Sequence, residues 1–170
     1  MHLQDKPLHA IMISIMSDPK ENWYKLTRSR SDLELAALAF ALKNGHSHEE
    51  FAAALWGKGA AKWMGKENPP PEEYLQRELD SFAWLFPQVE AALVKVTPDE
   101  AEVEFSAVGC PYGWGKDRWA RARNHGLTPE DAHRYCKEGF RIWGAALGLD
   151  SGTHPQEDGT CILRAVKHKG

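Results

Sequence analysis

Apolar residues recur every three or four positions across the first half of the chain, which is the spacing of amphipathic helices. A helix start is predicted at residues 17–19, with the helix running to Leu26. Residues 31–34 then place a serine and a glutamate as in a capping box, and the following apolar pattern stops at Asn44. The apolar positions of this second helix are Leu33, Ala36, Ala37, Phe40 and Ala41. The sequence therefore predicts two separate helices, the second with its N-cap at Ser31.

Three later segments also show helical signals. Residues 47–50 form a second capping box, which opens a helix to about Trp56. Another helix is predicted to begin near Glu72, and a further one has Thr128 as its N-cap and Pro129 at its first position. Their apolar stripes are Leu75, Leu79, Phe82 and Phe86 in the first, and Ala132, Cys136, Phe140, Trp143 and Leu147 in the second. Each stripe is predicted to face the core.

The hydrophobic period changes to two after residue 90, which is typical of strands. Residues 94–105 alternate on both sides of a short polar turn and predict a β-hairpin. Residues 160–167 predict a third strand. The polar segment before it contains Gly152, Pro155 and Gly159 and is predicted to be a loop.

These elements predict one α+β domain over residues 1–170. A helical leader, residues 1–90, precedes a hairpin, two helices and a closing strand in residues 91–170. We expect a small three-stranded antiparallel sheet with helices packed on one face, because an isolated hairpin would be marginally stable. Three cysteines fall in the second part of the chain.

Composition narrows the classes of partner. The formal net charge is -3 and the basic residues are scattered among acidic ones, which argues against nucleic acid as the main partner. The longest apolar run, residues 10–16, is far shorter than the roughly 20 residues that a membrane-spanning helix needs. The start has no basic segment of a signal peptide. We therefore expect a cytoplasmic protein with reduced thiols and no contact with membranes.

Cys110 follows the predicted hairpin inside a loop rich in glycine and aromatic residues. Such a loop at the end of a strand is a common place for reactive groups. A helix starting near Trp114 would place its positive end close to this thiol and favour the thiolate. Tyr112 and Trp114 of the same loop are predicted to contact a substrate, with Trp114 as a wall of an apolar pocket. The alternative is a structural cysteine in a tight turn.

Cys136 lies on the inward stripe of its helix, with His133 about one turn earlier. A histidine beside a thiol is the pair needed to form a thiolate by proton transfer. We therefore consider Cys136 and His133 candidate catalytic residues. The alternative is that Cys136 is a small buried apolar side chain and His133 is exposed.

Cys161 lies in the predicted last strand and shares a face with Leu163 and Ala165. If that face packs on the helices, Cys161 meets Cys136 inside the protein and helps to shape a pocket. Three thiols and one histidine would complete the four-coordinate shell of a zinc ion. However, the sequence has no closely spaced pair of cysteine or histidine ligands, which such sites usually contain. The histidines considered are His125, His133 and His154, of which His154 is also a predicted substrate contact. We predict no bound metal.

Several established motifs are absent from the sequence. There is no Gly-x-Gly-x-x-Gly fingerprint, no Walker phosphate loop, no Gly-x-Ser-x-Gly elbow and no His-Glu-x-x-His. Nucleotide-dependent and serine-hydrolase functions therefore have little support, and no cofactor is predicted.

The second half of the chain nevertheless resembles a known family. Cys110-Pro111 after a strand, Tyr135-Cys136 on a helix and Cys161 in a closing strand resemble the L-2-amino-thiazoline-4-carboxylic acid hydrolase-like family. The resemblance covers roughly residues 90 to 168. It implies a small bacterial or archaeal protein, some of whose relatives open a sulfur-containing five-membered ring by adding water, with the three cysteines as the matching residues.

Two main hypotheses follow for the function. The first is a cysteine-dependent hydrolase of a cyclic carbon–nitrogen or carbon–sulfur substrate, in which Cys110 attacks, His133 moves protons, and Cys136 and Cys161 shape the pocket. The second is a non-catalytic module in which the same thiols and tryptophans bind a small ligand, a metal, an iron–sulfur cluster or a tetrapyrrole such as haem. A structural protein whose cysteines belong to the core, or a homo-oligomer built on this domain, is a third hypothesis.

Overall fold

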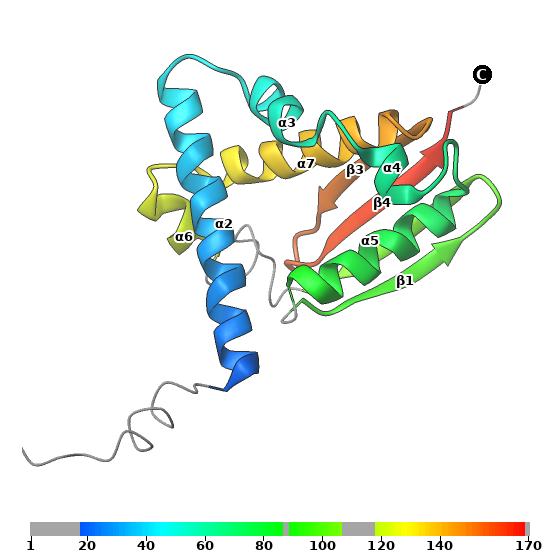
Figure 1. Cartoon of the computed structure of the whole chain (residues 1–170), viewed down its shortest axis with the longest axis horizontal. Helices are drawn as coiled ribbons and strands as arrows, with labels where there is room; N and C mark the ends of the chain where they lie inside the picture. The colour runs from blue at the N-terminus through cyan, green and yellow to red at the C-terminus, as the bar shows by residue number, and fades with distance from the viewer. Residues whose placement is uncertain (1–17, 87–88, 107–117, 169–170) are drawn as a thin grey trace, which may run out of the picture.

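The computed structural model describes residues 18–86, 89–106 and 118–168. Its helices occupy the first half of the chain and the stretch between two pairs of strands (Figure 1). In chain order the elements are α2 (Pro19–Lys43), α3 (His48–Trp56), α4 (Ala60–Met64), α5 (Pro71–Leu85), β1 (Ala91–Val96), β2 (Glu100–Phe105), α6 (Arg118–Asn124), α7 (Pro129–Ala145), β3 (Leu149–Pro155) and β4 (Cys161–Lys167). The prediction of an α+β fold with a helical first half is confirmed.

Helix α2 begins where the sequence predicted but does not stop at Leu26. Asp18 caps it by accepting a hydrogen bond from the backbone N–H of Lys20 at 3.0 Å. The predicted new start at Ser31 is wrong, because the helix continues through this residue. The Ser31 hydroxyl is buried and donates to the carbonyl of Thr27 at 3.0 Å, which satisfies it inside a continuous helix.

The apolar positions predicted for this helix lie only in part on its buried face. The buried face of α2 is Thr27, Ser31, Leu35, Leu38 and Ala41. Of the predicted apolar positions, Ala41 is buried, whereas Leu33 and Phe40 are 70% and 71% exposed. A helix with apolar residues on several sides has more than one face that could be buried. In this protein the buried face includes the hydroxyl groups of Thr27 and Ser31.

The predicted helix starts at Ser47 and Thr128 are confirmed. Ser47 and Glu50 exchange both hydrogen bonds of a capping box at the start of α3. Thr128 and Asp131 do the same for α7, and Pro129 occupies its first turn. These caps satisfy backbone N–H groups that have no partner inside the helix, and so fix where each helix begins.

The sheet has a fourth strand that the sequence did not predict. Its order is β1-β2-β4-β3 and all neighbours are antiparallel. The segment predicted to be a polar loop forms β3, which pairs along its whole length with β4. As an edge strand, β3 tolerates Gly152 and Pro155, because one side of its backbone needs no sheet partner. The predicted hairpin and last strand are confirmed.

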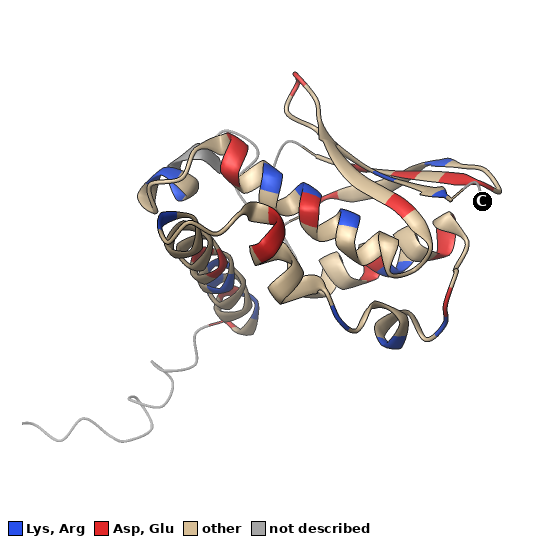
Figure 2. Cartoon of the chain, turned by 90° about the horizontal axis from the view of Figure 1, so that it is seen from above, with Lys and Arg blue, Asp and Glu red and all other residues tan. Residues whose placement is uncertain are grey.

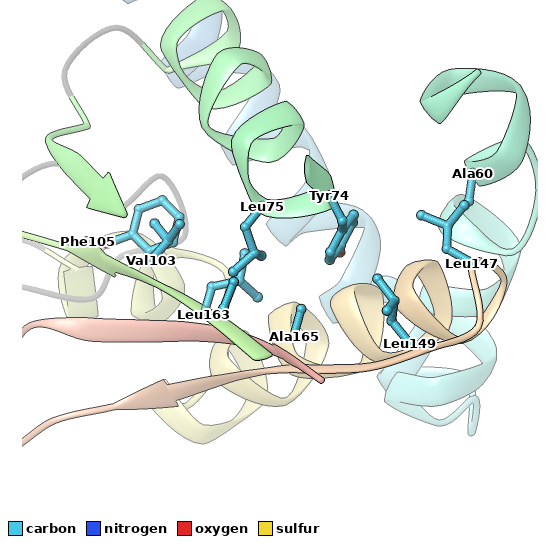
Figure 3. Close-up of a cluster of buried hydrophobic side chains, with 10 residues drawn as sticks. Ala60, Tyr74, Leu75, Val103, Phe105, Leu147, Leu149, Leu163 and Ala165 are labelled. Carbon is cyan, nitrogen blue, oxygen red and sulfur yellow. The ribbon is translucent and has the colours of Figure 1, made fainter. Parts of the chain in front are cut away.

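Helices α5 and α7 pack on the same face of this sheet. The face is built from alternate residues of all four strands, among them Leu149, Val103, Leu163 and Ala165, which meet Tyr74 and Leu75 of α5 (Figure 3). The opposite face carries charged side chains. There Lys95 and Arg164 flank Glu100 and hold the pKa of its carboxyl at about 2.

A second buried cluster joins the helices. Leu35 and Leu38 of α2, Ala52 of α3, and Ala132 and Tyr135 of α7 pack together. Helix α7 therefore contacts α3 on one side and β3 on the other. Acidic and basic residues are interspersed along the helices and the sheet (Figure 2). In the part of the chain that the structure describes, no helix has the length and apolarity to cross a bilayer.

The contact between α7 and β3 requires glycine at position 144. A Cβ atom there would lie 2.5 Å from the Cβ of Ser151 and 3.3 Å from the carbonyl oxygen of Leu149. We expect Gly144→Ala to lower the free energy of unfolding by about 1–3 kcal/mol, because overpacking outweighs the better helix propensity of alanine. Urea denaturation measures this. Gly152→Ala on β3 is the control, since a Cβ there meets nothing within 4 Å; equal stability of the two variants would contradict this account.

Candidate functional site

A cavity of about 240 Å³ lies between the helices that cover the sheet and the first helices of the chain. Helices α5 and α7 provide most of its lining, and α2, α3 and α4 provide the rest. Most of the lining is aromatic: three tryptophans, three phenylalanines and a tyrosine. The polar groups are few and distinct, namely Arg30, Glu78, Ser81, Tyr135 and Cys136.

The three tryptophans form a continuous wall. The ring of Trp143 on α7 lies 5.5 Å from Trp63 of α4 and 6.1 Å from Trp56 of α3, the latter edge-on. Gly139 on α7 lets the Trp56 ring approach, because a Cβ atom there would lie 3.2 Å from it. Phe82 of α5 stacks with Phe140 of α7 at 6.1 Å and adds a second aromatic wall. Rings in such contacts hold one another in place.

Glu78 of α5 is the buried carboxyl of the site, with 8% of its surface exposed. Burial disfavours its charge and raises the pKa of Glu78 to about 7, while the nearby Tyr74 hydroxyl lowers it in part. That hydroxyl and the hydroxyl of Ser151 are buried without completing a regular hydrogen bond to any described residue. A carboxyl in this state can exchange a proton near neutral pH.

Arg30 and Tyr135 belong to a chain of hydrogen bonds at the side of the cavity. The indole N–H of Trp56 donates to the Tyr135 hydroxyl at 3.0 Å, and this hydroxyl donates to Glu34 at 3.2 Å. Glu34 also accepts from the Nε of Arg30 at 3.1 Å. Burial raises the pKa of Tyr135, so the phenol keeps its proton and remains a donor. The charge of Arg30 is thus offset by Glu34.

The structure places the predicted site residues in different surroundings. Cys136 lines the cavity. Cys161 is half-buried at the sheet, packed against the core cluster, and does not line the cavity. The His133 ring lies 3.4 Å from the carbonyl oxygen of Thr153, and burial lowers the pKa of this histidine. His154 is exposed on β3.

Three predicted site residues, Cys110, Tyr112 and Trp114, lie outside the described residues. The position of the Cys110 sulfur relative to the cavity therefore stays a prediction; of the two described cysteines, Cys136 lines the cavity and Cys161 does not. Among residues 18–86, 89–106 and 118–168, no group of three histidine, cysteine or acidic side chains is arranged to hold a metal ion.

Sequence reasoning missed Glu78 and the part played by Trp56 and Trp63. A signal for Glu78 was present, because it lies three residues after Leu75 and four before Phe82 on the predicted apolar stripe. Comparisons of the chain with protein-family models, curated proteins and solved structures find no match. The cavity and its side chains therefore carry the functional inference.

The raised pKa of Glu78 makes stability depend on pH. Between an ordinary value of 4.5 and about 7 the folded protein holds a proton that the unfolded chain releases, so stability falls as pH rises through this window. Above pH 7 the free energy of unfolding is therefore about 3 kcal/mol lower than it would be if Glu78 had its ordinary pKa. We expect Glu78→Gln to be more stable than the wild type at pH 8 and similar to it at pH 4.5.

Denaturant unfolding of both proteins at the two pH values tests this expectation. Glu72→Gln on the exposed side of α5 is the control and should follow the wild type at both. An equal stability difference between wild type and Glu78→Gln at pH 4.5 and pH 8 would show that Glu78 titrates normally.

Proposed function

We propose that this protein binds a small aromatic molecule in the cavity lined by the tryptophan wall and Glu78. The observation that carries the proposal is the lining itself, aromatic on most sides with a few polar groups at separate points. This is the usual composition of small-molecule sites. A dry cavity of about 150 Å³ is enough for benzene, so about 240 Å³ suits a ligand of one or two rings.

The polar groups give such a ligand an orientation. Glu78 and Cys136 contribute to the lining from α5 and α7, the two helices that cover the sheet. Ser81 lies one turn after Glu78 on α5, where its hydroxyl donates to the carbonyl of Arg77. Ring stacking would supply most of the affinity, and hydrogen bonds to these groups would supply specificity.

Neutral aromatic probes test the proposal. We expect 4-methylphenol to raise the melting temperature of the protein and to give saturation-transfer NMR signals at pH 6, because the cavity buries its ring. Ser81→Trp would fill part of the cavity and weaken both effects. Trp84→Leu is the control, since Trp84 is 77% exposed on α5 and does not line the cavity. Equal responses in wild type and Ser81→Trp would rule out this cavity as the binding site.

A second candidate function is thiol-dependent hydrolysis, and the position of Cys136 on the cavity wall favours it. The resemblance of residues 90–168 to amino-thiazoline carboxylate hydrolases suggests a cyclic carbon–nitrogen or carbon–sulfur substrate. Cys110, the nucleophile predicted from the sequence, lies outside the described residues. Cys136 is the nucleophile that the described cavity offers.

The chemistry would proceed in two balanced steps. The Cys136 thiolate would form a sulfur–carbon bond to the electrophilic ring carbon, and the ring nitrogen or sulfur would leave with a proton supplied by Glu78. Water would then add its hydroxyl group to that carbon, give its remaining proton to the Glu78 carboxylate, and release the Cys136 thiolate as the new sulfur–carbon bond breaks. A carboxyl with a pKa of about 7 suits both directions of proton transfer at neutral pH.

Activity of cysteine variants separates the two candidates. If Cys136 is the nucleophile of such a hydrolase, the wild type opens 2-amino-thiazoline-4-carboxylate, and Cys136→Ser lowers kcat/KM by a factor on the order of 1,000 or more. Cys161→Ser, outside the cavity, retains turnover. The absence of turnover by the wild type, or full turnover by Cys136→Ser, would remove Cys136 as a nucleophile and leave the binding proposal intact.

A further inference from the structure

We propose that the ligand of this cavity is an aromatic cation, an aryl ammonium or a protonated heteroaromatic ring, held between the indoles of Trp56, Trp63 and Trp143 and the carboxylate of Glu78. This inference rests on the proposed binding function and specifies the chemical class of its ligand.

The first support is the carboxyl itself. Glu78 is more than nine-tenths buried, lines the cavity and interacts with Tyr74, a neutral phenol. No cation among the described residues forms an ion pair with it. A buried charge without an opposite charge is costly, and a cation arriving in the cavity would remove much of that cost.

The second support is the aromatic wall. The face of an indole attracts cations, more strongly than the face of phenol or benzene does. The Trp63 ring already contacts one cation, because the guanidinium of Arg77 lies 5.7 Å from the centre of this ring. Trp143 stands between Trp63 and Trp56, so three indoles are gathered at one cavity together with one carboxyl.

The other charged and titratable groups at the site do not oppose a cation. On α2, the positive charge of Arg30 is paired with Glu34 at 3.1 Å, and Glu34 accepts a further hydrogen bond from Tyr135. On α5 and α7, burial raises the pKa of Tyr74 and of Tyr135, so both phenols stay neutral. Cys136 of α7 brings no positive charge. Arg77 on α5 is exposed beside Trp63 and does not line the cavity. Among the lining groups and Glu34, the balance of fixed charge is therefore negative once Glu78 ionises.

Binding of a cation must then be linked to the proton on Glu78. Since the carboxyl has a pKa of about 7 without a ligand, a bound cation favours its ionised form and lowers that pKa. Below pH 7 the cation displaces the proton, and its affinity therefore increases as pH rises toward 8 and levels off above it.

Phenyltrimethylammonium and tert-butylbenzene form a matched pair of probes, because they share a shape and differ in one positive charge. We expect the full-length protein at pH 8 to bind the cation at least about tenfold more tightly than the hydrocarbon. In Glu78→Gln the ratio of the two affinities should fall to about one. Glu72→Gln, with an exposed carboxylate changed on the same helix, should keep the wild-type ratio.

A second measurement does not depend on variants. Calorimetric titration of the cation at pH 6.5 in two buffers of different ionisation enthalpy should show proton release, whereas tert-butylbenzene should release none. Absence of proton release would overturn the assignment of Glu78 as the counterion.

Failure of this inference can be told apart from failure of the proposed function. If tert-butylbenzene and 4-methylphenol bind but the cation binds no more tightly, the cavity is a neutral aromatic site and the inference is wrong. Tighter binding of phenylacetate than of the cation would show that the site prefers an anion, with Arg30 as its partner, and would also overturn the inference. If none of these probes binds, both proposals fail.

Discussion

The packing of α7 against two partners at once is the constraint on which the rest of the structure depends. At Gly139 the helix contacts the Trp56 ring of α3. At Gly144 it contacts β3, which can approach closely because glycine has no side chain. A Cβ atom at position 144 would clash with β3, and one at position 139 would push the Trp56 ring back slightly. Helix α7 thereby joins the helical cluster to the sheet, and its remaining inward residues, Cys136, Phe140 and Trp143, line the cavity between them.

This arrangement explains why a carboxyl can be buried there. Glu78 lies on α5, which packs on the sheet beside α7, and its side chain reaches a cavity that the aromatic rings keep open. The ring contacts of Trp143 with Trp63 and Trp56 support the wall of the cavity that Glu78 also lines. A protein that only needed stability would gain from an apolar residue at this position. The buried acid is thus more readily understood as part of a binding site.

Much of the fold could be predicted from short-range signals in the sequence. The capping residues Ser47 and Thr128 act through neighbouring backbone groups, and the alternation of residues 101–105 reflects one buried face, so both are visible in a local pattern. Strand β3 was not predictable in this way. Its pairing is supplied by β4, which overrides the weak strand preference of Gly152 and Pro155.

The candidate site was predicted less completely, for a related reason. Cys136 was identified because its helical stripe is local, and it does line the cavity. The position of Glu78 on the buried stripe of α5 was visible in the local pattern, but its raised pKa comes from burial by other elements, which no local pattern shows. Cys161 shares its strand face with Leu163 as predicted, but its place at the sheet is set by the pairing of β2 with β4. Its absence from the cavity lining therefore follows from strand pairing between residues far apart in the sequence, which local patterns do not show.

The titration of Glu78 itself tests the central claim most directly. Carbon-13 NMR of the glutamate side-chain carboxyls, with Glu78→Gln used to assign the signal, gives the midpoint of this group with and without a saturating aromatic cation. A midpoint near 7 that falls clearly when phenyltrimethylammonium is bound is the predicted result. A midpoint near 4.5 without the cation, or one that the cation leaves in place, would contradict a buried acid poised to receive a positive ligand.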